Sequence, residues 1–327
     1  MAFAPFVPLR VLSSYSMLEG AIDPKAIAKL AKDRGFPAIA MADRNGLYGS
    51  TAFAAACAAE GVQPIVGALL GVSRDDADMV DYLPLYVQDE AGWLNICHLV
   101  SRAHLDRPLE RDPHVTMDDL AGRTDGLIAL SGASEGGVTR LLADRKAARA
   151  EALADRLAAL FPGRFYIELA RRGDAVEEAA ESGLVDLAYA KNLPLVATNP
   201  ANFAEPHMAR AHDAMLCIAN SSQIDSADRP RSNEEGFVKT ASMMAELFSD
   251  LPEALSNSLV IAQRCAFAPP KRAPILPSLA GDQEGEVRML AEDARAGLEA
   301  RLSKYDVLSD AERAAYFERL DFEIGII

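Results

Sequence analysis

The sequence lacks the long apolar runs and the paired cysteines that mark membrane and secreted proteins. No apolar stretch approaches the ~18 to 20 residues of a membrane-spanning helix, and the segment before Arg10 has no signal-peptide core. The four cysteines, Cys57, Cys97, Cys217 and Cys265, lie far apart and form no C-x-x-C pair. We therefore interpret them as reduced thiols of a cytoplasmic protein that contacts no membrane.

Basic residues are also scarce. The chain has 33 Lys and Arg against 48 Asp and Glu, so its formal net charge is −15. Because duplex binding depends on cations that neutralise phosphates, this balance argues against a protein that holds DNA or RNA by itself. Half of the 327 residues are hydrophobic and a quarter are charged, which is typical of a folded globular protein.

Short apolar segments alternate with amphipathic helices along most of the chain. The expected strands cover residues 7–11, 37–42, 64–72, 83–87, 126–131, 165–169 and 193–198. The expected helices cover residues 24–34, 50–60, 89–104, 137–160 and 175–191. This alternation predicts βαβ units and a parallel sheet. Since no strand is followed by G-x-G-x-x-G or by a Walker-type glycine loop, a closed α/β barrel is favoured over a doubly wound sheet.

The character of the sequence changes after Cys265. Residues 268–277 (APPKRAPILP) form a proline-rich connector, and two helices are expected at 284–304 and 309–325. We therefore predict one domain over residues 1–270 and a connector with helices over residues 271–327. The chain stops inside the apolar run 321–327, so we expect it to belong to a longer protein.

Few residues suited to catalysis stand where a parallel barrel places its functional groups, at the ends of the strands. The residues at these ends are 10–12, Asp43, Arg44, Leu69, 131–133 and 199–202. They offer few of the convergent His, Asp and Glu side chains that a hydrolytic metal site needs. The nucleophile motif G-x-S-x-G is also absent.

The histidines and two loops leave alternatives open. The five histidines lack metal-site spacing, and His212 is expected to form a hydrogen bond rather than to act in catalysis. Residues 131–137 (SGASEGG) could cradle a phosphate with their backbone amides, or form a plain strand-to-helix turn. Residues 228–236 form either a solvated loop or a docking loop.

From end to end, the sequence resembles the N-terminal region of the C-family replicative polymerases, the alpha subunits of bacterial DNA polymerase III. Residues 6–20, FVPLRVLSSYSMLEG, are similar to that family's opening pattern F-V-H-L-x-V-H-S-x-Y-S-x-L-D-G. Residues 38–49, AIAMADRNGLYG, are similar to A-L-A-L-T-D-H-x-x-L-F-G. Shorter matches are PIVG (64–67), PLVATN (194–199), AHD (211–213) and DLPEAL (250–255).

This resemblance implies a fold for each part of the chain. Residues 1–270 would form a PHP (polymerase and histidinol phosphatase) domain, which is a distorted seven-stranded parallel (β/α) barrel. Residues 271–327 would form a short helical extension that leads into the polymerase palm. The palm aspartates and their Mg²⁺ are then expected beyond Ile327, so this chain should not polymerise DNA.

The resemblance also places nine metal-ligand positions on this sequence, and most of them no longer suit a metal. These positions are Arg10, Leu12, Glu19, Arg44, Leu69, Tyr82, Ala133, Pro200 and Asn202. Only Glu19 keeps a ligand type, because leucine, alanine and proline have no donor atoms and arginine stays cationic. We therefore expect a degenerate metal site, with no metal cofactor and no catalytic residue in this chain.

Two of the lost ligand positions are now cationic, while two acids remain near them in the sequence. We hypothesise that Arg10 and Arg44 stand where metal charge stands in intact sites. Each would pair with Glu19 or Asp43, so that a bidentate ion-pair network fills the site.

The resemblance implies a domain without catalytic activity inside a DNA-directed DNA polymerase that works in DNA replication. Its expected partners are the rest of the polymerase alpha subunit and the proofreading exonuclease subunit, with DNA contacted only through the full polymerase. The expected location is the cytoplasm, at the replisome on the nucleoid. Two alternatives remain: a metal-dependent phosphoesterase or 3′–5′ exonuclease in the barrel, and the PHP domain of the error-prone C-family polymerase used in translesion synthesis.

Overall fold

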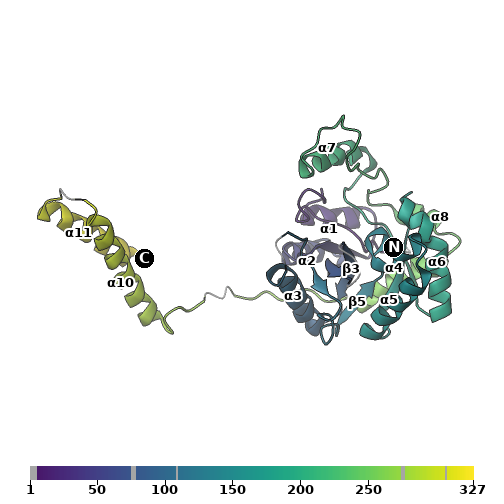
Figure 1. Ribbon diagram of the computed structural model, residues 1–327, viewed down its shortest axis with the longest axis horizontal. Helices are drawn as coiled ribbons and strands as arrows, with labels where there is room; N and C mark the ends of the chain where they lie inside the picture. The colour runs from purple at the N-terminus through teal and green to yellow at the C-terminus, as the bar shows by residue number, and fades with distance from the viewer. Residues whose placement is uncertain (1–5, 75–78, 108–109, 274–276, 306–307) are drawn as a thin grey trace. The chain divides into compact units, whose positions relative to one another are not determined.

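The computed structural model describes residues 6–74, 79–107, 110–273, 277–305 and 308–327. The chain divides into two units, Met1–Pro270 and Lys271–Ile327. The first unit contains the sheet and most of the helices, and the second contains two helices (Figure 1). Within the described ranges, no helix has both the length and the apolar character needed to cross a membrane.

A curled sheet of seven strands forms the centre of the first unit. The strands are β1 (Ala38–Arg44), β2 (Gln63–Ser73), β3 (Val80–Val87), β4 (Val115–Thr116), β5 (Leu127–Leu130), β6 (Phe165–Ala170) and β7 (Leu195–Thr198). They lie in the order β1-β2-β3-β5-β6-β7, and β4 pairs with the end of β2. This arrangement confirms the α/β class, and the predicted barrel takes the form of a curled sheet, a half-barrel.

The expectation of an all-parallel sheet is wrong at β3. This strand runs antiparallel to both β2 and β5, whereas the β1–β2, β5–β6 and β6–β7 pairs are parallel. The reason lies in the short connection between Ser73 and Val80, which has no room for a crossover helix. Antiparallel neighbours can be joined by a short turn, but parallel neighbours need a crossover of about a dozen residues or more.

Residues 6–12 join the two edges of this sheet, although they form no regular strand. The backbone oxygens of Pro8 and Val11 accept hydrogen bonds from the amides of Ala40 and Ala42 in β1. On the other side, Ala201 exchanges backbone hydrogen bonds with this segment, at Arg10 and Leu12. The strand expected at residues 7–11 is reduced to a single bridge because Pro8 has no N–H to donate. The seventh strand is instead β4, which the sequence did not reveal.

Nine α-helices are described in the first unit. They are α1 (Pro24–Asp33), α2 (Ser50–Glu60), α3 (Glu90–Leu105), α4 (Gly137–Ala143), α5 (Ala147–Leu160), α6 (Ala175–Lys191), α7 (Ala209–Ala219), α8 (Ala241–Leu247) and α9 (Pro252–Arg264). Two 3₁₀ helices, η1 (Ala133–Glu135) and η2 (Pro206–Met208), precede α4 and α7. The single helix expected at 137–160 is divided into α4 and α5, because Arg145 between them has a left-handed φ of 60°.

Two apolar clusters hold the first unit together, one inside the curled sheet and one between the sheet and the helices. In β1, Ala38, Ala40 and Ala42 belong to the inner cluster, whereas Ile39 and Met41 belong to the outer one. This follows from the period of two in a strand. Tyr86 fills the inner cluster, and its buried hydroxyl donates to the Leu9 carbonyl at 2.6 Å. The interior is therefore a packed core rather than an open channel.

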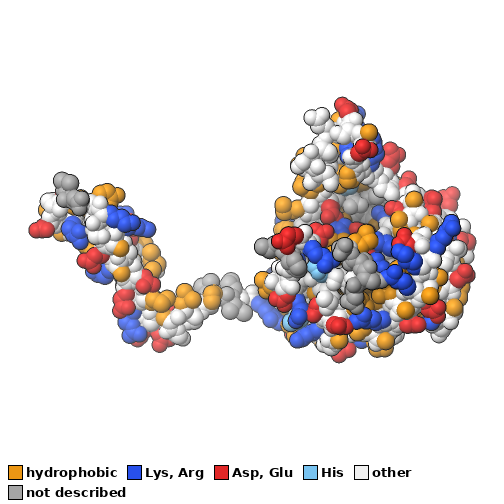
Figure 2. All heavy atoms as spheres, in the orientation of Figure 1, with side chains coloured by type: hydrophobic (Ala, Val, Ile, Leu, Met, Phe, Trp, Pro, Cys, Tyr) orange, Lys and Arg blue, Asp and Glu red, His pale blue; other side chains and the backbone are white. Residues whose placement is uncertain are grey.

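The second unit consists of α10 (Gln283–Leu302) and α11 (Asp310–Ile326). Each helix begins with a side-chain cap, from Asp282 and from the reciprocal pair Ser309–Glu312. Hydrophobic side chains are exposed along both helices (Figure 2), including Val287 and Phe322. The pair therefore has little apolar core of its own.

Candidate functional site: an arginine–glutamate network at the rim of the sheet

The rim at which β1, β5 and β6 end contains a pocket that gathers most of the predicted site positions. The pocket has a volume of about 590 Å³, counting space that opens to solvent. Its lining residues are Arg10, Leu12, Arg44, Leu69, Glu135, Arg172, Pro200, Ala201 and Asn202. Six of the nine positions taken from the resemblance are among them. Glu19 and Tyr82 line a neighbouring pocket that shares Arg44, and Ala133 lies in η1.

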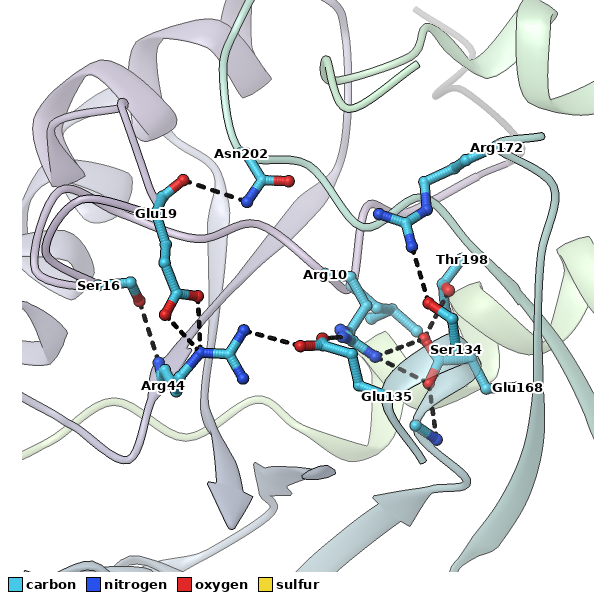
Figure 3. A network of polar contacts seen from close by, with 12 residues as sticks. Arg10, Ser16, Glu19, Arg44, Ser134, Glu135, Glu168, Arg172, Thr198 and Asn202 are labelled. Carbon is cyan, nitrogen blue, oxygen red and sulfur yellow. Dashed lines mark hydrogen bonds and ion pairs between the residues drawn. The ribbon is translucent and has the colours of Figure 1, made fainter. Parts of the chain in front are cut away.

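Arg10 is the buried centre of an ion-pair network (Figure 3). Its side chain is 3% exposed, and Nη1 donates to both carboxylate oxygens of Glu168 at 3.0 Å. Nη2 donates to Oε2 of Glu135 at 3.1 Å. Arg10 lies on the segment that joins the sheet edges, Glu168 on β6 and Glu135 on η1. The network therefore ties three separate parts of the rim together.

Arg44, the last residue of β1, continues the network toward solvent. Its Nε contacts the Glu19 oxygens at 2.8 and 2.6 Å, and its Nη2 donates to Oε1 of Glu135 at 2.7 Å. The guanidinium carbon also lies 4.1 Å from the centre of the Tyr82 ring. Glu135 thus bridges the two arginines. The sequence offered Glu19 as a partner for Arg44, and the two side chains are in contact.

The structure corrects the partners expected for Arg10 and for Asp43. Arg10 binds Glu168 and Glu135, which the sequence analysis did not select. Asp43 is buried and accepts three hydrogen bonds, from the amide and hydroxyl of Ser13 and from the hydroxyl of Ser16. These bonds, at 2.6 to 2.8 Å, satisfy its carboxylate and fix the loop that carries Glu19.

Glu168 is held by the backbone around it as well as by Arg10. Its carboxylate, with a side chain 0% exposed, accepts from the amide of Gly132 at 3.0 Å and from the hydroxyl of Thr198 at 2.6 Å. The turn at residues 131–137 therefore serves the site by donating one amide and by carrying Glu135. Gly132 and Ala133 both have positive φ, 98° and 44°, which turns the chain sharply before α4.

Electrostatics favour the charged forms of Arg10, Arg44 and Glu135. Burial opposes the charge of Arg10, but Glu168 and Glu135 outweigh it and raise the pKa of Arg10. Burial likewise opposes the charge of Arg44, and Glu135 and Glu19 raise its pKa. For Glu135, burial acts to raise the pKa, but Arg44 and Arg10 lower it below the ordinary value. Charge-assisted, bidentate contacts of this kind are the strongest hydrogen bonds in proteins.

A third arginine faces the pocket from the loop after β6. Arg172 contacts Oε1 of Glu177 through Nε at 3.1 Å and through Nη2 at 2.6 Å. Nη2 also donates to the hydroxyl of Ser134 at 3.2 Å. Glu177 is almost fully buried, and this burial raises its pKa although Arg172 opposes the shift. Sequence reasoning missed Arg172 because a charged residue just beyond a strand is usually a solvated one.

His212 anchors α7 to the site loop. Its Nε2 lies 2.8 Å from the carbonyl oxygen of Glu19, and its Nδ1 lies 2.7 Å from the hydroxyl of Ser232. The imidazole is buried, so the expected hydrogen-bonding role is confirmed. Arg229 binds both carboxylate oxygens of Asp213 at 2.8 and 2.6 Å. The loop at residues 228–236 is therefore packed against α7 through specific polar contacts.

The side chains at the pocket do not suit a metal ion. Among the described residues, no group of three or more His, Cys, Asp or Glu side chains is placed to hold one. Leu12, Leu69 and Pro200 present only carbon atoms, and each nearby carboxylate is already bound to an arginine or to several hydrogen-bond donors. Arginine repels a cation and cannot lose its proton in a protein.

Comparisons with known proteins identify a family and several relatives for this chain. The model of the PHP domain family matches residues 8–172. The chain is 43% identical over 329 aligned positions to the DNA polymerase III subunit alpha of Caulobacter vibrioides. It is 35% identical to that of Rickettsia bellii and 33% identical to that of Pseudomonas aeruginosa, each over 329 positions. These alignments cover 98% of this chain but only 28–29% of the relatives.

A solved structure shows a weaker likeness. An amidohydrolase from Chromobacterium violaceum has a TM-score of 0.40 and 16% identity to this chain. The match covers 59% of this chain and 86% of the amidohydrolase.

Proposed function

The chain belongs to the PHP domain family, and from this premise we propose that it is a catalytically inactive PHP domain at the N-terminal end of a DNA polymerase III alpha subunit. Three relatives that bear that subunit's name match the chain along 98% of its length. Because the chain spans less than a third of their length, the activity of the whole polymerase is itself part of the proposal. The relatives' name favours the replicative polymerase over its error-prone counterpart.

One observation carries the proposal of inactivity: positively charged arginines occupy the rim where the family binds its metals. Arg10 and Arg44 share Glu135 between them and each has a further carboxylate, Glu168 or Glu19. Positive charge is thus supplied by side chains that cannot polarise or deliver a water molecule as a metal does. The network would keep the positive charge that the metals supply, and it would lose their ability to activate a water molecule.

In this proposal the network's work is structural. It joins the segment at residues 6–12, the end of β1, η1 and β6, which are far apart in the sequence. A rim held in this way gives a rigid body on which neighbouring parts of a polymerase can rest. We further propose that the domain supports the palm, into which the second unit leads. It would also dock the proofreading exonuclease subunit of a cytoplasmic, nucleoid-associated replisome.

A metal analysis tests the proposal of catalytic inactivity most directly. The purified chain is dialysed without chelator, its Zn, Mn and Fe are measured by elemental mass spectrometry, and hydrolysis of a phosphodiester is measured in parallel. We expect less than stoichiometric metal and no turnover. Stoichiometric metal together with turnover that Glu19→Ala abolishes would overturn the proposal in favour of a phosphoesterase or an exonuclease.

Docking is tested separately, by gel filtration of this chain with the exonuclease subunit from the same organism. Co-elution at micromolar concentration supports the proposed partner, and separate elution contradicts it. Asp118→Ala serves as the control variant, because Asp118 is the exposed partner of the Arg156–Asp118 pair and its loss should leave the chain folded.

A further inference from the structure

Four large hydrophobic side chains are exposed on two neighbouring loops near the rim. Their exposed fractions are 47% for Tyr15, 79% for Met17, 38% for Leu18 and 64% for Tyr48. The first three belong to the loop that also carries Glu19, and Tyr48 belongs to the loop between β1 and α2. The loops meet where the ring centres of Tyr15 and Tyr48 lie 6.3 Å apart. We call these four residues the tyrosine surface.

We propose that the tyrosine surface docks a polypeptide segment in which apolar side chains stand next to Lys or Arg. This inference rests on the proposed docking of the exonuclease subunit, and it adds the face of the domain and the chemistry of the segment that binds there. Exposed hydrophobic residues that gather in one place mark interaction sites. Tyrosine is enriched among the residues that contribute most binding energy at interfaces, and methionine adapts its shape to a partner.

The loop that carries three of these side chains is held in a fixed shape. The buried carboxylate of Asp43 binds Ser13 and Ser16. The Ser16 hydroxyl also accepts a hydrogen bond from the amide of Arg44 at 3.0 Å (Figure 3). Leu18 has a φ of 63°, a left-handed conformation that is uncommon for residues other than glycine, so the turn has a specific shape. A surface that is fixed in advance loses less entropy on binding than a flexible one.

The charge next to the tyrosine surface favours a basic partner. A groove of about 1030 Å³, counting space that opens to solvent, is lined by Tyr15 and Met17 and by the carboxylates of Glu19 and Asp112. Arg44 is the single Lys or Arg among the described residues that line this groove, and two carboxylates already bind it. A Lys or Arg of the partner can therefore approach the groove, and the net charge of −15 attracts a basic segment from a distance.

Single-stranded DNA fits this surface less well, although its bases also stack on tyrosine. Binding of a single strand needs cations that follow its phosphates. The groove offers Arg44 for this purpose, and Arg44 is already paired with Glu19 and Glu135. The observations therefore favour a polypeptide.

The place where the first unit ends favours a separate polypeptide over the continuation of this chain. Gln63, the first residue of β2, donates to the carbonyl oxygens of Ala262 and Cys265 at 2.6 and 3.3 Å. These residues, at the end of α9, thus lie at the amino ends of β1 and β2, whereas the rim lies at the carboxyl end of β1.

Isothermal calorimetry of the whole chain with the exonuclease subunit from the same organism tests the proposal. Tyr48→Ser removes an exposed ring, so the chain should stay folded, and we expect the Kd to rise about tenfold or more. Met17→Ser should raise the Kd severalfold. Tyr189→Ser on α6 is the matched control, because this ring is 60% exposed and lies outside the tyrosine surface, so its Kd should equal the parent's.

Two further measurements test the chemistry of the bound segment. Asp112→Asn should weaken binding severalfold at low ionic strength, and the difference should vanish at about 1 M salt, where the Debye length is about 3 Å. A photoreactive phenylalanine analogue in place of Tyr48 identifies the bound segment by mass spectrometry. Crosslinking to a segment with apolar residues next to Lys or Arg supports the inference, and crosslinking to an acidic segment contradicts it.

The outcomes separate this inference from the proposed docking. If the parent chain does not bind the exonuclease subunit, both are wrong. If the parent binds, and Tyr48→Ser and Met17→Ser bind equally well, the docking stands and the tyrosine surface is not its location. A single-stranded oligonucleotide is titrated in parallel. Saturable binding of the oligonucleotide that Tyr48→Ser abolishes, with exonuclease binding unchanged, would assign the surface to DNA and overturn the inference.

Discussion

Replacing Glu168 by glutamine removes the most buried charge of the network without changing the shape of the side chain. The parent carboxylate is fully buried and both its oxygens contact Nη1 of Arg10. Glutamine keeps an oxygen for the hydroxyl of Thr198 but leaves Arg10 with Glu135 as its remaining acid. Losing one partner of a buried ion pair costs about 3–5 kcal/mol. Because Glu135 remains, we expect about 3 kcal/mol, or roughly 6–12 °C in Tm for a domain of this size.

Equilibrium unfolding in urea, followed by tryptophan fluorescence, measures this loss. Trp93 is the single tryptophan of the chain, and it packs against Phe267, so it reports on the first unit. Arg44→Gln provides the comparison at the outer end of the network. There the side chains of Arg44 and Glu19 are 20% and 35% exposed, so water shares their solvation. The expected loss is about 1–2 kcal/mol, between the values for surface and buried pairs.

A double-mutant cycle with Arg10→Met isolates the interaction itself. The pair Arg10→Met with Glu168→Gln should be less destabilised than the two single losses added together, because neither charge is then left alone. The reasoning is refuted if the free energy of unfolding of Glu168→Gln lies within about 0.5 kcal/mol of the parent's value. It is also refuted if the loss in the double variant equals the sum of the two single losses within that margin.

Three other predictions follow from the same contacts. The pKa of Glu135 is lowered because Arg44 and Arg10 outweigh the effect of its burial. The stability that this carboxylate contributes is therefore fully present above the ordinary glutamate pKa near 4.3, and it is lost as the pH falls through the lowered pKa. Urea midpoints measured from pH 7 to pH 3 should therefore fall more steeply for the parent than for Glu135→Gln, and parallel curves would contradict this. His212→Ala removes both hydrogen bonds that anchor α7. Limited proteolysis should therefore cut within residues 220–236 several times faster than in the parent, and equal rates would show that other contacts hold this segment. Burial raises the pKa of Cys57 and of Cys265 to about 12, so iodoacetamide at pH 8 should leave both unmodified until urea is added, as judged by peptide mass spectrometry.

Much of the fold could be predicted from the sequence, because apolar runs and caps are local signals. Strands β1, β2, β5, β6 and β7 and most of the helices lie where periodicity places them. The direction of β3 was missed because an apolar run has the same appearance in either orientation. The absence of a helix between Val72 and Leu83 was the available signal, since a parallel crossover needs more chain than those residues provide.

The location of the site was predictable, but its pairing was not. The rim positions were found from the order of strands and turns and from the family resemblance. Glu168 was treated as part of a strand, although a glutamate inside an otherwise apolar strand (FYIEL) indicates that a cation must lie nearby. Its partner is Arg10, which lies 158 residues away in the sequence. The fold brings these two residues together, and no local sequence pattern predicts such a contact.

The reversed direction of β3 also changes the electrical environment of the rim. Helices α2, α4 and α6 follow strands that end there, so their amino termini, which carry partial positive charge, lie at the rim. Helix α3 follows the reversed strand and returns to the rim with its carboxyl end, where Nε2 of His104 lies 2.8 Å from the carbonyl oxygen of Asn45. The negative end of α3 thus lies beside Arg44 and Tyr82, while the positive end of α2 follows Arg44 and that of α6 follows Arg172. The rim therefore carries helix ends of both signs, which an all-parallel sheet would not give it.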